Sequence, residues 1–429
     1  MVKRTRLAGL LAVLTGFVVF AVGVVSNSSA AGGGGGLGTG AVTNYLKYVG
    51  GKSGAANPKL SPVQIGFVNQ QGGAVVIGAN ATTGAQVAVQ YANKQLGGIA
   101  GHPIKLVPCY IKAAEQEGTT CGQQFLADKK LDVIDEGAVG VGIQSLFSTL
   151  GGKKPVIASV AVTNVDATQK NAVILFGDGL HVLAPYGTYA KQVLHAKTAA
   201  VVYENEPGIG PDAQAWIKAL KQEGISVTSQ AYPPTQTDVT GPLISANAAK
   251  ADIVIPGTDA NGCVNMANAL KQEGITDPRK IVANPLCLNA QVISALGDFP
   301  LWTYGIASSL VGDASDPGVP PYLKVFKTFN QTKNAPDPWS LANFGSMMST
   351  IRFLNAAAKA HKGNVAKITP AQVLRIAKAF KGPQALGAPA LSCGSLKGDP
   401  GVCNQRAQFF TYKGKNTWSK AASWLQPPK

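Results

Sequence analysis

The sequence has little charge, and the charge that it has is unbalanced. Only 14% of its 429 residues are charged, and 38 lysine and arginine residues outnumber 22 acidic ones, which gives a formal net charge of +16. A basic balance can indicate nucleic-acid binding. Here the lysines are dispersed along the chain, with no arginine-rich run and no basic stripe spaced by aromatic residues. We therefore expect no nucleic-acid partner and interpret the charge as a solvated surface.

The common catalytic and metal-binding motifs are also missing. The chain has no G-x-S-x-G, no H-E-x-x-H and no complete Walker loop, and no histidine neighbours a candidate nucleophile. Its 4 histidines are isolated and no C-x2-C pair occurs, so we predict neither a metal site nor a cofactor. The sequence favours a binding protein over an enzyme. One enzymatic alternative stays open, because Glu204, Glu206 and Asp259 fall on loops that we place at one cleft and paired carboxylates can support hydrolysis.

Cysteine is sparse, but its 6 residues are an even number. In an exported chain this favours disulfide bonds, and six cysteines allow about 15 pairings. The cysteines fall into three local pairs along the sequence. We predict the bonds Cys109–Cys121, Cys263–Cys287 and Cys393–Cys403.

Only one apolar run is long enough to span a membrane. It covers residues 7–25, follows three basic residues and precedes a run of small residues that reaches Ala30. This is the pattern of a secretory signal over residues 1–30, with an uncleaved N-terminal anchor as the alternative. No cysteine lies near the cut, so we do not expect a lipoprotein. We expect a secreted or extracytoplasmic protein associated with the cell envelope.

Beyond the signal, a glycine run opens residues 31–60, which we predict to be a flexible spacer. Short apolar runs then alternate with helical stretches in two blocks. This rhythm predicts an α/β protein of two lobes, each with βαβ units and a mainly parallel sheet. The expected strands are 63–68, 103–107, 132–135, 155–159, 172–176, 199–203, 226–230, 252–255 and 280–283, and the expected helices include 79–96, 120–129, 144–150, 212–222, 239–248 and 264–272.

Several motifs, in order along residues 61–425, resemble the branched-chain amino-acid-type (leucine/isoleucine/valine-binding) solute-binding proteins. They are Gly84-Ala85-Gln86 with the crossing from Asn93 to Ile104, Pro155–Ser159, Asn343-Phe344-Gly345 opening a helix that reaches Ala360, Gly382-Pro383, and Phe409–Trp418. Each motif is weak alone, and their order makes the set specific.

The resemblance implies a type I periplasmic-binding fold, in which two Rossmann-like lobes are joined by three crossings with a ligand cleft between them. We assign the N-terminal lobe to residues 61–178 and 311–384, and the C-terminal lobe to residues 179–310 and 385–429. The crossings are expected near residues 176–179, 308–312 and 382–387.

The resemblance also implies partners. These are a small-molecule ligand, an ABC-transporter permease and its ATPase, and we expect a monomer. The alternative function is a ligand sensor or surface-binding protein on the same fold, because a fold does not fix a function.

Ligands of such sheets lie outside the carboxyl ends of the strands. The resemblance places ligand contacts at the turn Ala138–Gly140 and at Thr163, for which a tight turn and a helix N-cap are the structural alternatives. The ligand-binding residues that we predict on strand-end loops are Asn69, Ile77, Ala138, Val139, Gly140, Ala161, Thr163, Glu206, Ile209 and Asp259.

The second lobe departs from the family's pattern. It lacks the aromatic residue expected near Ile209, and no acid follows Ala283 to pair with a ligand ammonium group. An unpaired buried charge is costly. We therefore predict a small, mostly apolar or aromatic ligand with a carboxylate or other polar end, rather than a branched-chain amino acid.

Overall fold

The computed structural model describes residues 40–73, 78–206 and 209–429. The predicted signal over residues 1–30, the spacer up to residue 39 and Ile77 lie outside the described residues. Within the described part of the chain, no helix has both the length and the apolar character that a membrane crossing requires.

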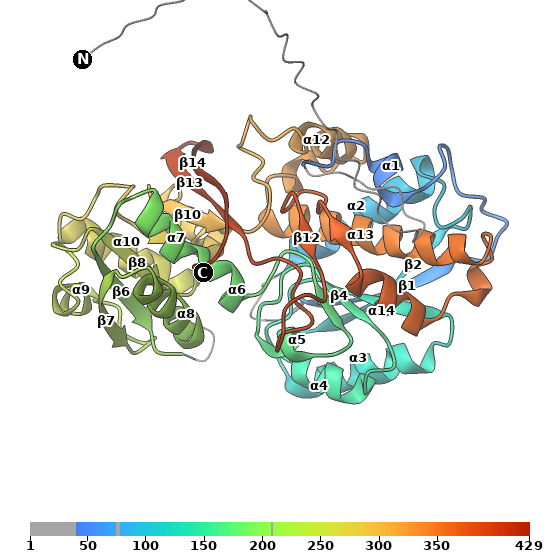
Figure 1. The fold of residues 1–429 in the computed structure, drawn as a ribbon, viewed down its shortest axis with the longest axis horizontal. Coiled ribbons are helices and arrows are strands. Elements are labelled where there is room, and N and C mark those ends of the chain that lie inside the picture. The colour runs from blue at the N-terminus through green and yellow to red at the C-terminus, as the bar shows by residue number, and fades with distance from the viewer. Residues whose placement is uncertain (1–39, 74–77, 207–208) are drawn as a thin grey trace, which may run out of the picture. The chain divides into compact units, whose positions relative to one another are not determined.

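The first lobe is built on a five-stranded parallel sheet in the order β2-β1-β3-β4-β5. Its inner strands are apolar runs buried on both faces, because helices cover both sides of the sheet. In Figure 1, α2 and α13 lie on one side of the sheet and α3 and α4 on the other. The strands are β1 (Val63–Gln70), β2 (Ile104–Ile111), β3 (Leu131–Glu136), β4 (Val156–Ala158) and β5 (Ala172–Ile174), and the main helices are α2 (Ala79–Gln95), α3 (Glu115–Ala127), α4 (Ile143–Leu150), α5 (Val165–Thr168), α12 (Val319–Thr328), α13 (Pro338–Ala360) and α14 (Pro370–Lys378).

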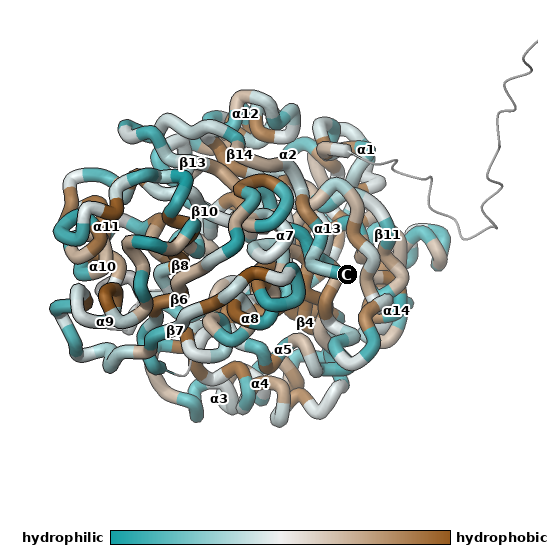
Figure 2. The backbone as a smooth tube through the Cα atoms, turned by 60° about the vertical axis from the view of Figure 1, so that its left-hand side comes forward, coloured by the Kyte–Doolittle hydropathy of each residue, from teal (hydrophilic) through white to brown (hydrophobic). Residues whose placement is uncertain are grey.

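The second lobe carries a three-stranded parallel sheet, β7-β6-β8, and a four-stranded mixed sheet, β14-β13-β10-β9. A parallel bridge between Val254 and Ile281 links the two sheets. The strands are β6 (Thr198–Glu204), β7 (Ser226–Tyr232), β8 (Ile253–Gly257), β9 (Val282–Ala283), β10 (Thr303–Ile306), β13 (Ala407–Gly414) and β14 (Thr417–Leu425), and the helices are α6 (Gly179–Leu183), α7 (Pro185–Gln192), α8 (Ile209–Gln222), α9 (Thr240–Ser245), α10 (Ala260–Gln272) and α11 (Ala290–Leu296). Figure 2 shows hydrophobic stretches along the inner strands and hydrophilic ones on outer loops. The predicted two-lobed α/β fold class is confirmed.

The predicted spacer differs from the structure where the structure describes it. Helix α1 (Tyr45–Val49) forms inside it, and Tyr45, Tyr48 and Val49 are buried in the core of the first lobe. The Tyr48 hydroxyl lies 2.8 Å from the Ser349 Oγ on α13. Two buried aromatic rings outweigh the glycine-rich composition that suggested a flexible segment.

The predicted third crossing is also placed wrongly. Residues 385–403, which we assigned to the C-terminal lobe, pack in the first lobe: Leu386, Leu391 and Cys393 belong to its core. The chain then follows β5, where the Ile174 N–H donates to the Gly401 carbonyl and the Cys403 N–H to the Ile174 carbonyl. The glycines and prolines of this segment suggested a flexible link, but its apolar residues attach it to the sheet edge.

All three predicted disulfide bonds are present, Cys109–Cys121, Cys263–Cys287 and Cys393–Cys403. The first joins β2 to α3. The second joins α10 to the short 3-10 helix Pro285–Cys287 that follows β9. The third closes the segment 393–403, which runs beside β5.

Helix α13 lies against α2, and the two backbones approach closely at Gly84. A Cβ at Gly84 would lie 2.2 Å from the Ser340 carbonyl oxygen and 3.0 Å from the Phe344 nitrogen. The helix begins at Pro338, where the Asp337 side chain accepts from two backbone N–H groups. The close approach of α2 and α13 therefore explains why glycine stands at the first position of the Gly84-Ala85-Gln86 motif.

We predict that Gly84→Ala destabilises the protein by about 1–3 kcal/mol, because the methyl group would force two buried helix backbones apart. Urea unfolding followed by circular dichroism measures this change. Gly241→Ala is the matched control, since Gly241 lies in α9 with nothing within 4 Å of its Cβ position. A stability for Gly84→Ala equal to that of the control would contradict the close packing.

Candidate functional site

The carboxyl end of β1 holds the turn that follows β3. The Asn69 Oδ1 accepts from the Ala138 N–H at 2.9 Å, and the Gln70 Oε1 accepts from the Gly140 N–H at 2.8 Å. Asn69 is fully buried, and Val139 belongs to the hydrophobic cluster beneath the turn. The predicted ligand donors at Ala138 and Gly140 are thus used inside the protein. We assign Asn69, Ala138, Val139 and Gly140 to the support of the site rather than to ligand contact.

The next loop lies at the ends of β4 and β5. Ala161 is buried, and its N–H donates to the Gly177 carbonyl at 3.2 Å. The half-buried Thr163 Oγ1 accepts from the Val165 N–H at 3.3 Å. The N-cap of α5 is Asn164, so the prediction that Thr163 caps a helix is wrong by one residue. A hydroxyl that accepts one bond can still donate its own hydrogen.

In the second lobe, three acidic side chains gather at the carboxyl ends of β6 and β8. Glu204 ends β6, Glu206 follows it by two residues, and Asp259 caps α10 directly after β8. One carboxylate oxygen from each lies within 4.8 Å of the others. The Glu204 Oε2 accepts from the Asp259 N–H at 2.7 Å, and the Asp259 Oδ1 accepts from the Gly262 N–H at 2.8 Å. The structure thus brings together Glu206 and Asp259, as predicted from the sequence, with Glu204 as a third member.

Burial sets the charge of this cluster. Burial raises the pKa of Glu204 to about 7. The charges of Asp259 and Glu206 also raise this pKa, whereas the hydrogen bond from the Asp259 N–H lowers it. Burial and the charge of Asp259 also raise the pKa of Glu206. Carboxyl groups with raised pKa values are typical of functional sites.

Two further residues at this edge have different roles from those expected. Ile209 is buried, and its side chain contacts the Cβ position of Gly257, so it belongs to the packing of α8. Tyr232, which the sequence analysis missed, ends β7 beside Glu204 and is 2% exposed. The signal that could have found it is its place at the end of the strand that neighbours β6.

The chain is similar to known proteins in sequence and in fold. Residues 62–395 match the family model described as periplasmic binding protein. The chain belongs to this family. No curated protein sequence matches the chain. The predicted family resemblance is confirmed.

Solved structures share the fold at low identity. An ABC transporter substrate-binding protein from Sphaerobacter thermophilus matches with a TM-score of 0.71 at 13% identity, over 86% of this chain and 99% of that one. The branched-chain amino acid binding protein LivJ from Streptococcus pneumoniae, solved with isoleucine, matches with a TM-score of 0.64 at 16% identity, over 84% and 100%. A solute binding protein from R. palustris, solved with 4-hydroxybenzoate, matches with a TM-score of 0.65 at 16% identity, over 86% and 98%.

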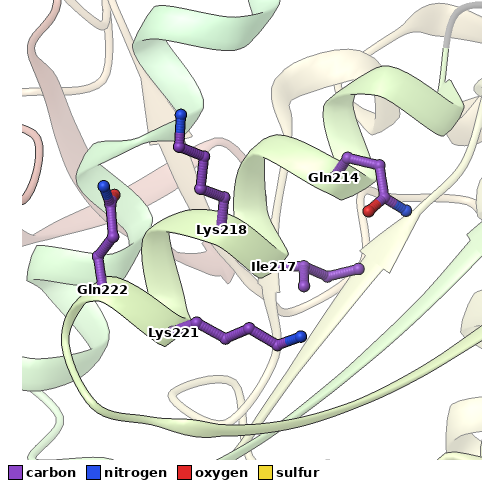
Figure 3. Close-up of a pocket in the computed structure, with 5 residues that line it drawn as sticks. All are labelled: Gln214, Ile217, Lys218, Lys221 and Gln222. Atoms are coloured by element: carbon purple, nitrogen blue, oxygen red, sulfur yellow. The ribbon is translucent and has the colours of Figure 1, made fainter.

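In this periplasmic binding protein, a hollow lies on α8 (Figure 3). It is lined by residues of that helix alone: Gln214, Ile217, Lys218, Lys221 and Gln222. None of these follows the carboxyl end of a strand, and none is a predicted site residue. The hollow therefore plays no part in the site.

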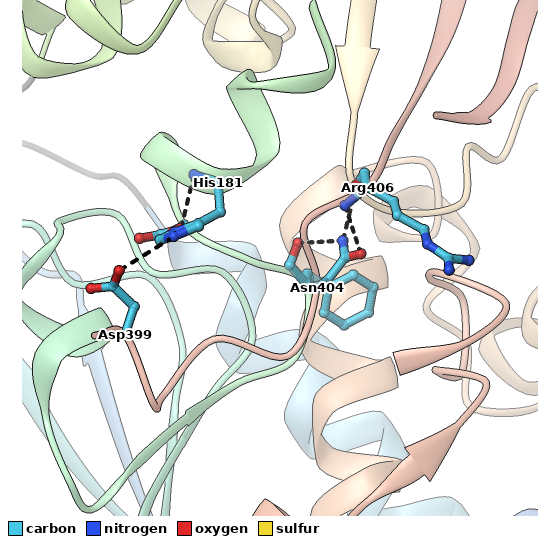
Figure 4. A network of polar contacts seen from close by, with 6 residues as sticks. His181, Asp399, Asn404 and Arg406 are labelled. Carbon is cyan, nitrogen blue, oxygen red and sulfur yellow. Dashed lines mark hydrogen bonds and ion pairs between the residues drawn. The ribbon is translucent and has the colours of Figure 1, made fainter. Parts of the chain in front are cut away.

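The predicted crossing at residues 176–179 lies beside residues 404–406 (Figure 4). The Asn404 Nδ2 donates to the Phe176 carbonyl at 3.0 Å, and its Oδ1 accepts from the Arg406 N–H at 3.0 Å. The His181 Nδ1 lies 2.6 Å from the Asp178 Oδ1 and its Nε2 lies 3.6 Å from the Asp399 Oδ2. His181 therefore links α6 to the segment that the Cys393–Cys403 bond closes.

We predict that this histidine stabilises the protein in a pH-dependent way. Burial lowers the pKa of His181, but the hydrogen bond and charge of Asp178 and the charge of Asp399 outweigh it, so the pKa is raised. Because the unfolded value is about 6.5, the contribution is fully present below about pH 6.5 and is lost as pH rises through the raised folded pKa. His181→Gln should therefore destabilise the protein more at about pH 6 than at about pH 9.

Urea unfolding of both proteins at the two pH values measures the difference. The matched control is His361→Gln, at a histidine whose Nε2 lies 3.1 Å from the Gln372 Oε1 rather than beside a carboxylate. A pH-independent effect of His181→Gln would show that the two ion pairs do not contribute.

Proposed function

We propose that the protein captures a small organic solute between its two lobes by closure and delivers it, as a monomer, to an ABC-transporter permease and its ATPase. The observation that carries the proposal is the family match over residues 62–395, which spans strand-end loops of both lobes. Those loops present Thr163 in the first lobe, and Glu204, Glu206 and Asp259 in the second. In parallel α/β sheets, ligands bind at these ends.

We propose a binding role and no catalytic one. The family and the solved relatives are ligand-binding proteins, and several relatives belong to ABC transporters. The same family membership supports an extracytoplasmic location.

For the ligand, we propose a mostly apolar or aromatic compound with a carboxylate end. We propose that the Thr163 hydroxyl donates to that carboxylate from the first lobe. Leu286, which follows β9 in the second lobe, is 38% exposed and offers an apolar surface at the strand ends. Relatives solved with benzoate and 4-hydroxybenzoate, at 15% and 16% identity, are consistent with such a ligand class.

We predict that mass spectrometry of small molecules released from the purified protein identifies an aromatic or aliphatic carboxylate. Thr163→Ala should weaken its binding by about 10–100-fold, because a hydrogen bond to a charged group contributes about 1.5–3 kcal/mol. Thr163→Ser keeps the hydroxyl and should bind as the wild type does. Calorimetric titration measures all three proteins.

The same titration with leucine, isoleucine and valine decides the ligand class. Micromolar binding of these amino acids, lost in Thr163→Ala, would contradict the proposed ligand while leaving the binding function intact.

Closure gives a separate prediction. A ligand that contacts both lobes favours the closed population, so small-angle scattering should show a smaller radius of gyration at saturation. Asn404→Ala removes the side chain that joins residue 176 to residues 404–406. This variant should change the radius of gyration of the ligand-free protein, and it should still show a smaller radius of gyration when ligand binds. An unchanged radius of gyration in the wild type at saturation would indicate a rigid scaffold.

A further inference from the structure

The acidic cluster of Glu204, Glu206 and Asp259 concentrates negative charge in a basic protein. The chain has 38 basic and only 22 acidic residues, yet three of the acids converge within 4.8 Å. None of the ion pairs found among the described residues involves Glu204 or Glu206. Like charges at this distance repel one another strongly, and more so where they are buried. Such a cluster calls for a positive charge at its centre.

A second feature, independent of the acids, points to the same place. Residues paired across neighbouring parallel strands have their side chains on the same face of the sheet, and Tyr232 pairs with Glu204. Tyr232 is 2% exposed, and its hydroxyl has no hydrogen-bond partner among the described residues. Burial and the charges of Glu204, Asp259 and Glu206 raise the pKa of this hydroxyl, and the nearby Thr258 side chain lowers it. A buried hydroxyl without a partner is costly, and an ion that takes its oxygen as a ligand would remove that cost.

Gly262 packs directly against the cluster. A Cβ at this position would lie 2.0 Å from the Glu204 Oε1 and 1.8 Å from the Thr258 Oγ1. The Glu204 Oε2 accepts from the Asp259 N–H. One Glu204 carboxylate oxygen is therefore held by the backbone, and the other fits beside residue 262 only because that residue is glycine.

From these contacts we propose that Glu204, Glu206 and Asp259, with the Tyr232 hydroxyl, bind a divalent cation of the size of calcium at the carboxyl ends of β6, β7 and β8. This replaces our prediction that the chain has no metal site, which rested on histidine and cysteine spacing alone. The inference does not depend on the identity of the solute.

The ligand atoms decide the class of the ion. All are oxygens, which suit calcium, magnesium or manganese rather than zinc or copper. Calcium binds oxygen at about 2.3–2.6 Å and magnesium at about 2.0–2.1 Å. Calcium accepts oxygen ligands in a flexible geometry, whereas magnesium requires near-ideal octahedral geometry and keeps several waters. Three side chains whose oxygens lie within 4.8 Å of one another therefore suit calcium better.

The experiment is a calorimetric titration of the chelator-treated full chain with calcium chloride, repeated with magnesium chloride. We expect one calcium ion per chain, with a dissociation constant in the range of about 10⁻⁵–10⁻³ M for an extracellular oxygen site. Calcium should also raise the melting temperature of the wild type, because it binds only the folded chain.

Three variants test the residues. Glu206→Gln should weaken calcium binding by at least about 10-fold, and Tyr232→Phe should weaken it less, as a more peripheral ligand. In chelator, Tyr232→Phe should unfold at a urea concentration at least as high as the wild type, because it removes a buried hydroxyl that has no hydrogen-bond partner there. Glu223→Gln is the matched control, since Glu223 follows the opposite end of α8 and should leave calcium binding unchanged.

Several outcomes would overturn the proposal. These are no calcium binding at about 10 mM, equal binding by the wild type and Glu206→Gln, or tighter binding of magnesium than of calcium. Binding of ethylammonium but not of calcium would also overturn it and would assign the acids to an organic cation. Solute binding measured separately, with Thr163→Ala, distinguishes these results from a failure of the proposed transport function.

Discussion

Helices α2 and α13 approach so closely at Gly84 that a methyl group would not fit between them. Their contact joins segments about 260 positions apart in the sequence, as the bond from the Ser340 hydroxyl to the Asn80 carbonyl also does. Helix α1 packs on the same α13, where the Tyr48 hydroxyl reaches Ser349. The first lobe therefore closes around one long buried helix. The strand ends that carry Thr163 are held in place by this packing.

The strand-end loops differ in what they offer a ligand. On the first lobe, the side chains of Asn69 and Gln70 occupy backbone donors of the turn after β3, which fixes the shape of that turn but removes it from ligand contact. On the second lobe, the acids at the ends of β6 and β8 bring charge instead of donors. The two sides therefore have opposite chemical preferences. In the site that we propose, the Thr163 hydroxyl would donate to an anionic group and the acids would bind a cation.

Periodicity and local chemistry predicted much of this structure. The runs that became β1 and β6 are apolar and bounded by turn residues, and the cysteine pairs are local, so both could be predicted without tertiary information. The predictions that failed depend on contacts between distant residues. Tyr48 is buried only because α13 covers it, and the segment that ends at Cys403 is ordered because β5 offers it a free edge. Likewise, Tyr232 comes beside the acids only through its register with Glu204.

The end of the chain completes the second lobe. Strand β13 pairs with β10, and its residues Phe409 and Phe410 are fully buried, one in each of the two hydrophobic clusters of that lobe. Until these residues have been synthesised, β10 has no partner on one side, and each of the two clusters lacks one of its aromatic rings. Folding of this lobe therefore waits for residues 407–414, which supply an inner strand of its mixed sheet.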